Sequence, residues 1–506
     1  MKGRASLKLN VAANYVGQFY MAAISMLLLP VQVRLLGSEA YGLVGFFAML
    51  SGWLQLLDIG MSPTLARETA KYRAGGLDKD SYRQLLHSVG ALFLCLGVGV
   101  GLLVFVLSGP ISRHWLHLQS LSPSTVADAV AMMGFVFALR WQATVSRSVL
   151  VGLEQQIWVN IINATFATLR SVGVLAALQW FSSTPKTFFV YQAAVAAVEL
   201  GVLQLIVHRS LTLGLPTRAS LSLAPLRRVA NFSLTIAFAT IIAVSGTQLD
   251  NLLLSTFLPL SEYAWFSLAV MAAGGISLLS GPIGQAVQPR LTYLNANGDE
   301  STFRATYSDA TQMLSAIALT ASFTMAFGAR PLLWAWTGNA ELADRTAAVL
   351  SFYALGNGFL AVVAMAYYLQ IARGDLRLHL RGNVTLAVLL LPTIVAATLR
   401  WGMLGASLVW CGANLSFLLV WSAIVHHRFL PGQHVRWLLR DALLPGLVGA
   451  AGSLLVHLIH WEALSRFLTA LTLASVGAVS VGLAVLVTSP VRRTIKGFGS
   501  VRGAVP

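Results

Sequence analysis

The sequence has few charged residues and almost no cysteine. Asp, Glu, Lys and Arg make up 10% of the 506 residues and hydrophobic residues 57%, whereas soluble domains carry about 25% charged residues. This composition excludes an ordinary soluble domain and indicates a polytopic membrane protein. The two cysteines, Cys95 and Cys411, both lie in apolar runs. They provide neither a disulfide framework nor the spacing of a zinc site.

Motifs of common catalytic sites are also missing. The sequence contains no Walker A loop, no nucleophile elbow and no HExxH motif. Membrane glycosyltransferases and polymerases tend to carry acidic residues in a large outer loop, but here the first expected outer loop holds only Glu39 and the others are short. We therefore expect a protein that is not an enzyme and that needs no cofactor.

Long apolar segments recur along the whole chain. A transmembrane helix needs about 20 mostly apolar residues. About fourteen segments meet this criterion, beginning near residues 9, 40, 85, 124, 157, 188, 229, 262, 306, 346, 381, 403, 440 and 467. The basic N-terminus, MKGRASLKLN, leads directly into the first of them without a small-residue cleavage site. We expect a retained first helix rather than a removed signal peptide.

The basic residues are distributed unevenly among the loops. With the N-terminus inside, 24 of the 34 Lys and Arg residues fall on inner segments, 7 on outer loops and 3 within spans. Cytoplasmic loops of membrane proteins carry such an excess of positive charge. The distribution predicts an even number of spans with both termini in the cytoplasm. It also explains the net charge of +16 without a nucleic-acid partner.

Three arginines interrupt otherwise apolar sequence in the fourth and fifth predicted spans. Arg140 and Arg147 lie seven residues apart, close to two helical turns, and therefore on one face of a helix. Arg170 follows in the next span. An arginine at the centre of a membrane helix costs about 2.5–3.5 kcal/mol on insertion scales, so such residues usually face a protein interior or an aqueous cavity. We expect the three to receive an anionic cargo. The alternative is that they form ion pairs that hold the helices together.

Acidic and polar residues also occur within predicted spans. Asp58, Glu199 and Asp250 are candidates for coupling transport to a proton or sodium gradient, or for pairing with the arginines. Asp58 belongs to a polar stripe of helical spacing in the second span, which we expect to bend at Pro63. The polar residues that we expect to line a cavity are Gln55, Asn163, Gln192, Thr247 and Asn357.

The chain divides into two similar halves. The pair Ser38-Glu39 precedes Arg67 by 29 residues, and Ser261-Glu262 precedes Arg290 by the same interval. The longest inner connection, residues 208–228, separates the halves. Repeats of equal orientation imply two lobes around a central cavity. The domains predicted are a six-helix lobe (1–215), a second six-helix lobe (216–439), and two further helices with a cytoplasmic tail (440–506).

Two segments of the second half have distinctive composition. The eighth predicted span is rich in glycine and proline, which predicts a bent or interrupted helix. His426, His427 and His434 lie without acidic companions, so we expect a solvated or headgroup-contacting inner loop rather than a metal site.

Three stretches of the sequence resemble a known family. NYVGQFYMAAISMLLLPVQVRLLGSEAYGLVGFFAMLSGWLQLLDIGMSPTLARE, GLEQQIWVNIINATFATLRSVGVL and TQLDNLLLSTFLPLSEYAWFSLA are similar to segments of the polysaccharide-repeat flippases, the O-antigen translocases of the Wzx type. The likeness covers residues 10–75 and 140–270. Relatives often carry a basic residue after the aspartate of the seventh span, but this chain has Asn251. The resemblance therefore puts a coupling role of Asp250 in doubt.

The resemblance implies a fold, a cargo and partners. The fold is that of the multidrug/oligosaccharidyl-lipid/polysaccharide exporters, a MATE-like all-α arrangement of two six-helix lobes, here with two extra helices. The implied cargo is a polyprenyl-diphosphate-linked oligosaccharide, moved from the cytoplasmic to the periplasmic leaflet of the bacterial inner membrane. A polysaccharide polymerase and a chain-length regulator are the implied protein partners.

Other functions remain open on the same sequence. A multidrug exporter of this fold would favour acidic and aromatic cavity residues for cationic drugs, and three intramembrane arginines disfavour it. A lipid II-type flippase would carry a cargo of the same chemical class. A purely structural scaffold would not need polar residues in so many spans.

Overall fold

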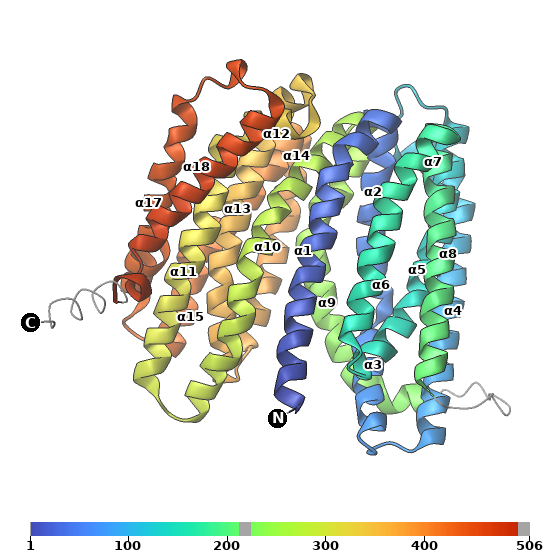
Figure 1. Ribbon diagram of the computed structural model, residues 1–506, viewed down its shortest axis with the longest axis horizontal. Helices are drawn as coiled ribbons and strands as arrows, with labels where there is room; N and C mark the ends of the chain where they lie inside the picture. Colours follow the sequence, from blue (N-terminus) through green and yellow to red (C-terminus); the bar gives the residue numbers. More distant parts are fainter. Residues whose placement is uncertain (1, 212–223, 494–506) are drawn as a thin grey trace, which may run out of the picture. The chain divides into compact units, whose positions relative to one another are not determined.

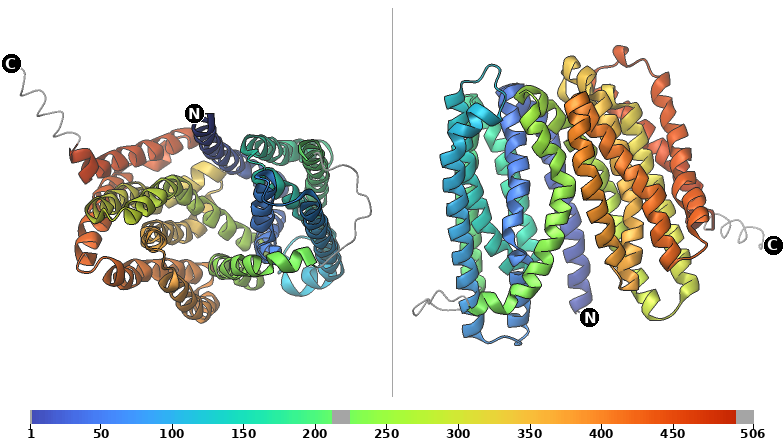
Figure 2. Two further views of the ribbon diagram at one scale, coloured as in Figure 1. Left: turned by 90° about the horizontal axis from the view of Figure 1, so that it is seen from below. Right: turned by 180° about the vertical axis from the view of Figure 1, so that it is seen from behind.

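The computed structural model describes residues 2–211 and 224–493, apart from the side chains of residues 2–16 and of scattered positions in α9 and α10. The described chain is helical (Figure 1), with one isolated β-bridge between His117 and Pro259. It divides into two compact units, Met1–Ala264 and Trp265–Pro506. Within each, the long helices run side by side (Figure 2).

The first unit contains ten named helices or helical turns before α8, then α8, α9 and the start of α10. In chain order its elements are α1 (Lys2–Leu36), α2 (Ser38–Leu54), η1 (Gln55–Asp58), α3 (Met61–Arg73), α4 (Lys79–Pro110), η2 (Ile111–Trp115), α5 (Pro123–Gly152), α6 (Gln156–Thr168), η3 (Leu169–Gly173), α7 (Val174–Trp180), α8 (Pro185–Ser210) and α9 (Ala224–Phe257). Helix α5 packs against α3, α4 and α8 and lies at the centre of this unit's helix contacts.

The second unit contains most of α10 and all later elements. They are α10 (Leu260–Ala296), α11 (Glu300–Phe327), α12 (Ala329–Thr337), α13 (Ala340–Arg373), α14 (Arg377–Ser416), η4 (Phe417–Trp421), α15 (Ser422–Phe429), α16 (His434–Arg436), η5 (Trp437–Leu443), α17 (Leu444–Ser453), η6 (Leu454–Leu458), η7 (Trp461–Ala463) and α18 (Arg466–Leu486). Helix α13 packs against α11 and α14, and α17 and α18 pack against α11.

Twelve helical segments of the described chain are long and apolar enough to cross a membrane. The predicted class, an all-α polytopic membrane protein, is confirmed. The predicted number of fourteen spans stays a prediction. Helix α9 is not among the twelve, and one of the twelve, Arg377–Phe429, covers the predicted spans that begin near residues 381 and 403.

Helix α14 reverses direction at Gly402. This residue has φ 56° and ψ −140°, a backbone conformation that is available essentially to glycine alone. A Cβ atom on Gly405 would collide with the carbonyl oxygen of Ala397, and one on Gly382 would collide with the ring of Trp421. These close approaches mean that the two arms of the segment lie against each other as an antiparallel pair.

The second predicted span differs from the expected continuous helix. Helix α2 ends at Leu54, the turn η1 follows, and α3 begins at Met61. Ile59 and Gly60 have φ 49° and 67°, and left-handed residues end a helix sharply. The interruption therefore lies before Pro63, which belongs to α3. The polar stripe around Asp58 does not occupy one continuous helix face, and this expectation was wrong.

Two further expectations concern an interruption in the eighth span and the boundaries between domains. Helix α10 runs from Leu260 to Ala296 without interruption, so the eighth span is not interrupted, and a bend within it stays a prediction. The predicted domain boundary at 215/216 falls in residues 212–223, outside the described part of the chain. The division into units falls after Ala264, within the first turns of α10. The lobes 1–215 and 216–439, with 440–506 as an addition, stay predictions.

The two Ser–Glu turns of the internal repeat meet at the loop that follows η2. Ser38 and Glu39 begin α2, and the Glu39 carboxylate accepts hydrogen bonds from the backbone N–H groups of Gln119 (2.6 Å), Ser120 (2.8 Å) and Leu121 (3.2 Å), and from the Ser120 hydroxyl. From the other turn, Ser261 Oγ donates to Gln119 Oε1 at 2.6 Å. One loop thus contacts both copies of the motif.

Candidate functional site

Helices α5 and α8 start with the same kind of cap. Ser122 caps α5 and Thr184 caps α8, each by accepting a hydrogen bond from the backbone N–H three residues later, and each is followed by proline. Proline at the first helical position is pre-organised for a helix start. Next to the caps, Lys186 Nζ pairs with Asp128 Oδ2 at 3.0 Å.

Two arginines of α5 contact two polar residues of α8 in matching register. Arg140 Nη2 donates to Gln192 Oε1 at 2.8 Å, and Arg147 Nη2 pairs with Glu199 Oε1. Both pairs are separated by 52 residues, so the two helices run parallel. The two contacts are about 10 Å apart along the axes, since seven residues make two turns.

The third arginine reaches the same carboxylate from a π-helical turn. Arg170 lies in η3, and its Nη1 pairs with Glu199 Oε2 at 2.6 Å. A π turn leaves backbone carbonyls without their usual helical partners. Here Gln192 Nε2 donates to the Arg170 carbonyl at 3.2 Å and Tyr191 Oη donates to the Leu169 carbonyl at 3.0 Å. Gln192 therefore contacts two of the three arginines.

We call Arg140, Arg147 and Arg170 the arginine cluster. Among the contacts described above, Glu199 supplies the one carboxylate of the cluster. The three guanidinium groups carry three positive charges and Glu199 one negative charge, which leaves a formal excess of two positive charges. The Glu199 side chain is 1% exposed, whereas those of Arg147 and Arg170 keep 25% and 22% exposure. The cluster is thus positively charged and partly accessible.

Two guanidinium donors in the cluster have no acceptor. Nε of Arg140 and Nε of Arg147 are buried without a hydrogen-bond partner. A buried donor left unpaired costs about 1–3 kcal/mol, more for a charged group. The Arg140 guanidinium also lies over the ring of Phe47 on α2, with Cζ 5.4 Å from the ring centroid, a cation–π contact. No pattern in the sequence points to Phe47 as a partner of Arg140.

The contacts bear on the alternative interpretation of the arginines, ion pairing between helices, whereas binding of an anionic cargo stays a prediction. Arg147 and Arg170 form the ion pairs of the alternative interpretation, with Glu199 as their shared partner. Arg140 contacts an amide and an aromatic ring instead. Gln192, predicted as cavity lining, orients Arg140. Glu199, predicted as a coupling residue, is the counterion of the cluster.

The remaining predicted residues of the first unit lie apart from these contacts. Asp58 Oδ1 accepts hydrogen bonds from the backbone N–H (3.1 Å) and hydroxyl (2.8 Å) of Ser62, and Gln55 is exposed. Asp250 is 5% exposed, and its Oδ1 accepts from the backbone and side-chain nitrogens of Asn251.

Two further predicted residues add little to this picture. Asn163 is partly buried on α6. The side chain of Thr247 lies outside the described residues. Their predicted place in a cavity between the lobes stays a prediction, as does that cavity.

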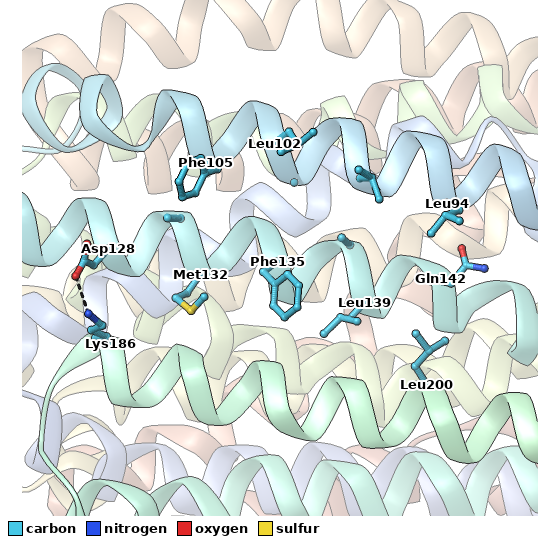
Figure 3. A pocket seen from close by; sticks show the side chains of 14 residues that line it. Leu94, Leu102, Phe105, Asp128, Met132, Phe135, Leu139, Gln142, Lys186 and Leu200 are labelled. Carbon is cyan, nitrogen blue, oxygen red and sulfur yellow. Dashed lines mark hydrogen bonds and ion pairs between the residues drawn. The ribbon is translucent and has the colours of Figure 1, made fainter.

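A groove of about 570 Å³ lies beside the cluster, between α4, α5 and α8 (Figure 3). Its lining is mostly apolar, with Leu102, Phe105 and Phe135 along its length. The Asp128–Lys186 pair and Gln142 supply polar groups. The three arginines are not among its lining residues, so the groove and the cluster are separate features of this unit.

In the second unit, Asn357 lines a cavity of about 340 Å³. Its Oδ1 accepts a hydrogen bond from Trp410 Nε1 at 3.0 Å. The cavity also contains residues that sequence reasoning missed, among them Gln370, Asn383 and Asn414. Each is a single amide in an apolar span, and no spacing in the sequence links them.

The histidines of the second unit are placed differently from the expected solvated loop. His426 lies on α15 and is 1% exposed. Its Nε2 is 2.8 Å from Tyr307 Oη, and its Nδ1 is 3.0 Å from Nδ1 of His434. The expectation of a solvated loop was therefore wrong for His426. Within the described residues, no group of three or more His, Cys, Asp or Glu side chains could hold a metal ion.

The fold is similar to solved structures of transporters. The lipid II flippase MurJ, in an inward closed conformation, aligns with a TM-score of 0.71 and 11% identity over 93% of this chain and 97% of that one. An inward-facing multidrug resistance MATE family transporter of the MOP superfamily gives 0.59 and 14%, over 80% and 93%. The MATE transporter VcmN of Vibrio cholerae gives 0.53 and 12%, over 85% and 98%. The chain is thus a multi-pass membrane protein with the fold of MOP-superfamily transporters.

The family is defined by the sequence itself. Residues 7–295 match the family described as polysaccharide biosynthesis protein. Because this match covers more than half of the 506 residues, the chain belongs to that family. Among curated proteins, none matches the sequence. The predicted resemblance to the polysaccharide exporters of this superfamily is confirmed.

Proposed function

We propose that the protein is a flippase for a polyprenyl-diphosphate-linked oligosaccharide, such as an O-antigen or related polysaccharide repeat unit. The arginine cluster binds the diphosphate, and alternating access moves the cargo from the cytoplasmic to the periplasmic leaflet of the bacterial inner membrane. The observation that carries this proposal is the gathering of three guanidinium groups around one buried carboxylate, with two Nε donors left unpaired.

The chemistry of the cluster suits a diphosphate. A guanidinium group offers planar, paired donors that match phosphate oxygens, and it stays charged at any relevant pH. The excess positive charge attracts an anion to the arginine cluster. A diphosphate supplies acceptors for the Nε groups of Arg140 and Arg147, and Arg147 and Arg170 are partly exposed in spite of their pairing with Glu199. A cationic drug, in contrast, would be repelled.

The sequence pattern and the family support the proposed location and partners. The excess of basic residues on the predicted inner segments supports cytoplasmic termini. Membership of a polysaccharide biosynthesis family supports cooperation with a polysaccharide polymerase and a chain-length regulator. A lipid II-type cargo has the same diphosphate chemistry, so the lipid-linked glycan that accumulates on the cytoplasmic leaflet after deletion of the gene identifies the cargo.

We predict that Arg140→Ala lowers transport of the lipid-linked glycan about tenfold or more, while the amount of protein in the membrane stays unchanged. Loss of one charged hydrogen bond weakens binding by about 1.5–3 kcal/mol. Arg140 is the informative position because its removal leaves no carboxylate unpaired. Arg140→Lys should restore transport in part, having the charge but not the planar donors. Surface glycan and membrane protein are measured in the same cells.

The control is Arg113→Ala, which removes an exposed arginine of η2 and should leave transport unchanged. If Arg140→Ala protein fails to accumulate, or accumulates and transports normally, Arg140 is a structural residue and the diphosphate site is wrong.

The acidic residues Asp58, Glu199 and Asp250 are our candidates for ion coupling. Asp58 is the clearest of them, because its carboxylate accepts hydrogen bonds only from Ser62 among its described contacts, whereas Glu199 already pairs with two arginines. We predict that Asp58→Asn makes transport less dependent on the proton or sodium gradient. The measurement is uptake of lipid-linked glycan by proteoliposomes with each gradient imposed or collapsed. An unaltered gradient dependence in Asp58→Asn removes Asp58 from the mechanism.

A further inference from the structure

The 340 Å³ cavity of the second unit lies between α10, α13, the two arms of α14 and η4. Its volume falls within the range of about 300–1,000 Å³ that is typical of small-ligand sites. None of its described lining residues is Lys, Arg, Asp or Glu. The polar side chains that line it are those of Ser277, Asn357, Tyr367, Gln370, His379, Asn383 and Asn414. We call it the amide cavity.

One amide in this cavity has an acceptor atom without a partner. Gln370 is 1% exposed, and its Nε2 donates to the Ala366 carbonyl of its own helix at 3.1 Å. Its Oε1 is buried and accepts no hydrogen bond. A buried orphan acceptor is destabilising, and native structures retain few of them. A ligand in the amide cavity that donates a hydrogen bond would satisfy this acceptor.

Two other amides are oriented by the same residue, Trp410. Asn357 Oδ1 accepts from the Trp410 indole N–H at 3.0 Å, and Asn414 Nδ2 donates to the Trp410 carbonyl at 2.9 Å. Asn357 thereby keeps donors available, and Asn414 keeps an acceptor. Asn383 Nδ2 lies 3.0 Å from His379 Nε2. Together with Gln370, the cavity offers both donors and acceptors, held in place by neighbours.

Aromatic rings complete the lining. The rings of Tyr367 and His379 are 4.4 Å apart between centroids, and those of Phe417 and Trp421 stack at 5.7 Å with an interplanar angle of 22°. The face of an aromatic ring carries partial negative charge. It therefore attracts the weakly positive C–H groups that cover one face of a pyranose ring.

We propose that the amide cavity binds a neutral sugar residue of the glycan. Hydroxyl groups both donate and accept hydrogen bonds, as these amides require, and the C–H face of the sugar packs on the aromatic rings. A phosphate would find no arginine or lysine among the lining residues, and a cationic drug would find no carboxylate. The inference rests on the proposed function, because the glycan of that cargo supplies the sugar.

The test measures binding to the purified full-length protein with four probes that share one isoprenyl chain. They are the bare isoprenyl diphosphate, the same diphosphate carrying glucose, the same carrying N-acetylglucosamine, and the uncharged isoprenyl glucoside. Wild-type protein should bind at least one of the two sugar diphosphates more tightly than the bare diphosphate. Gln370→Met should weaken binding of that probe about 3- to 10-fold, the effect of one neutral hydrogen bond, and leave the bare diphosphate unaffected.

A matched control comes from the first unit. Gln142 also has a buried Oε1 without a partner, but it lines the apolar groove. Gln142→Met should leave the gain in affinity due to the sugar unchanged. Asn383→Leu, a second variant of the amide cavity, should lower that gain as Gln370→Met does. Unaltered affinity for the bare diphosphate demonstrates that each variant is folded.

The outcomes separate this inference from the proposed function. If the sugar adds no affinity in wild-type protein, or if Gln370→Met weakens all probes equally or none, the amide cavity is not a sugar site. If the protein does not bind the bare diphosphate but binds the uncharged glucoside in a Gln370-dependent way, the diphosphate site fails and the sugar site stands.

Discussion

Glu199→Ala should lower the free energy of unfolding of the protein by about 3–5 kcal/mol, the usual cost of removing one partner from a buried ion pair. Glu199 is 1% exposed and pairs with both Arg147 and Arg170. Its removal leaves three guanidinium groups close together without a carboxylate. Their mutual repulsion and the loss of two charge-assisted hydrogen bonds act in the same direction. Denaturant or thermal unfolding of the detergent-purified protein measures the effect.

A second substitution tests whether charge imbalance is the cause. Glu199→Ala combined with Arg170→Leu removes one positive charge along with the negative one, so the double variant should be more stable than Glu199→Ala alone. Glu154→Ala is the control, because Glu154 pairs with Arg73 where both side chains are at least half exposed, and such pairs contribute about 0–1 kcal/mol. Equal stability of Glu199→Ala and Glu154→Ala would show that the cluster does not depend on its counterion.

Glu39→Ala should be the second most destabilising change, lowering the free energy of unfolding by about 2–4 kcal/mol because it leaves several N–H groups of one loop without their acceptor. The Glu39 side chain is 7% exposed and accepts from Gln119, Ser120 and Leu121. In the same loop, Gln119 Oε1 accepts a hydrogen bond from the Ser261 hydroxyl. Loss of Glu39 therefore loosens the junction of both Ser–Glu turns.

The matched control for Glu39 is Glu341, which also lies in the first turn of a helix. Glu341 is 63% exposed and pairs only with Arg345, four residues later at 3.2 Å, among its described contacts. Glu341→Ala should cost about 0.5 kcal/mol or less. Glu39→Gln keeps one acceptor oxygen, so it should lower the free energy of unfolding by less than Glu39→Ala and by more than Glu341→Ala. A small effect of Glu39→Ala, similar to that of Glu341→Ala, would mean that water replaces the carboxylate at this loop.

The sequence could identify the individual helices and the faces of the polar residues, since both depend on local composition and spacing. Apolar runs of about 20 residues predicted the spans, and the interval of seven predicted that Arg140 and Arg147 share a face. The same interval separates Gln192 from Glu199. Neither spacing indicates that the Arg140–Arg147 face and the Gln192–Glu199 face pack against each other in register.

Local backbone breaks were harder to predict than spans. The end of α2 before Ile59 and the reversal at Gly402 depend on single residues that adopt left-handed conformations. Pro63 seemed the stronger signal, yet proline in the first turn of a helix costs little, and α3 contains it without a kink at that residue. The glycines and prolines of α10 likewise failed to interrupt that helix.

By itself, the sequence determined that this is a multi-pass membrane protein with arginines inside its spans, because the hydrophobic effect and the cost of charge in a bilayer act on every residue whatever its neighbours. Only the tertiary structure decided that Glu199 pairs with two of the arginines while Arg140 contacts Gln192 and Phe47. It also brought amides from α13 and from both arms of α14 into the cavity that Gln370 lines. Hydrogen bonds and ion pairs reach only a few ångströms, so they depend on which helices pack together, and spacing along the chain does not contain that information.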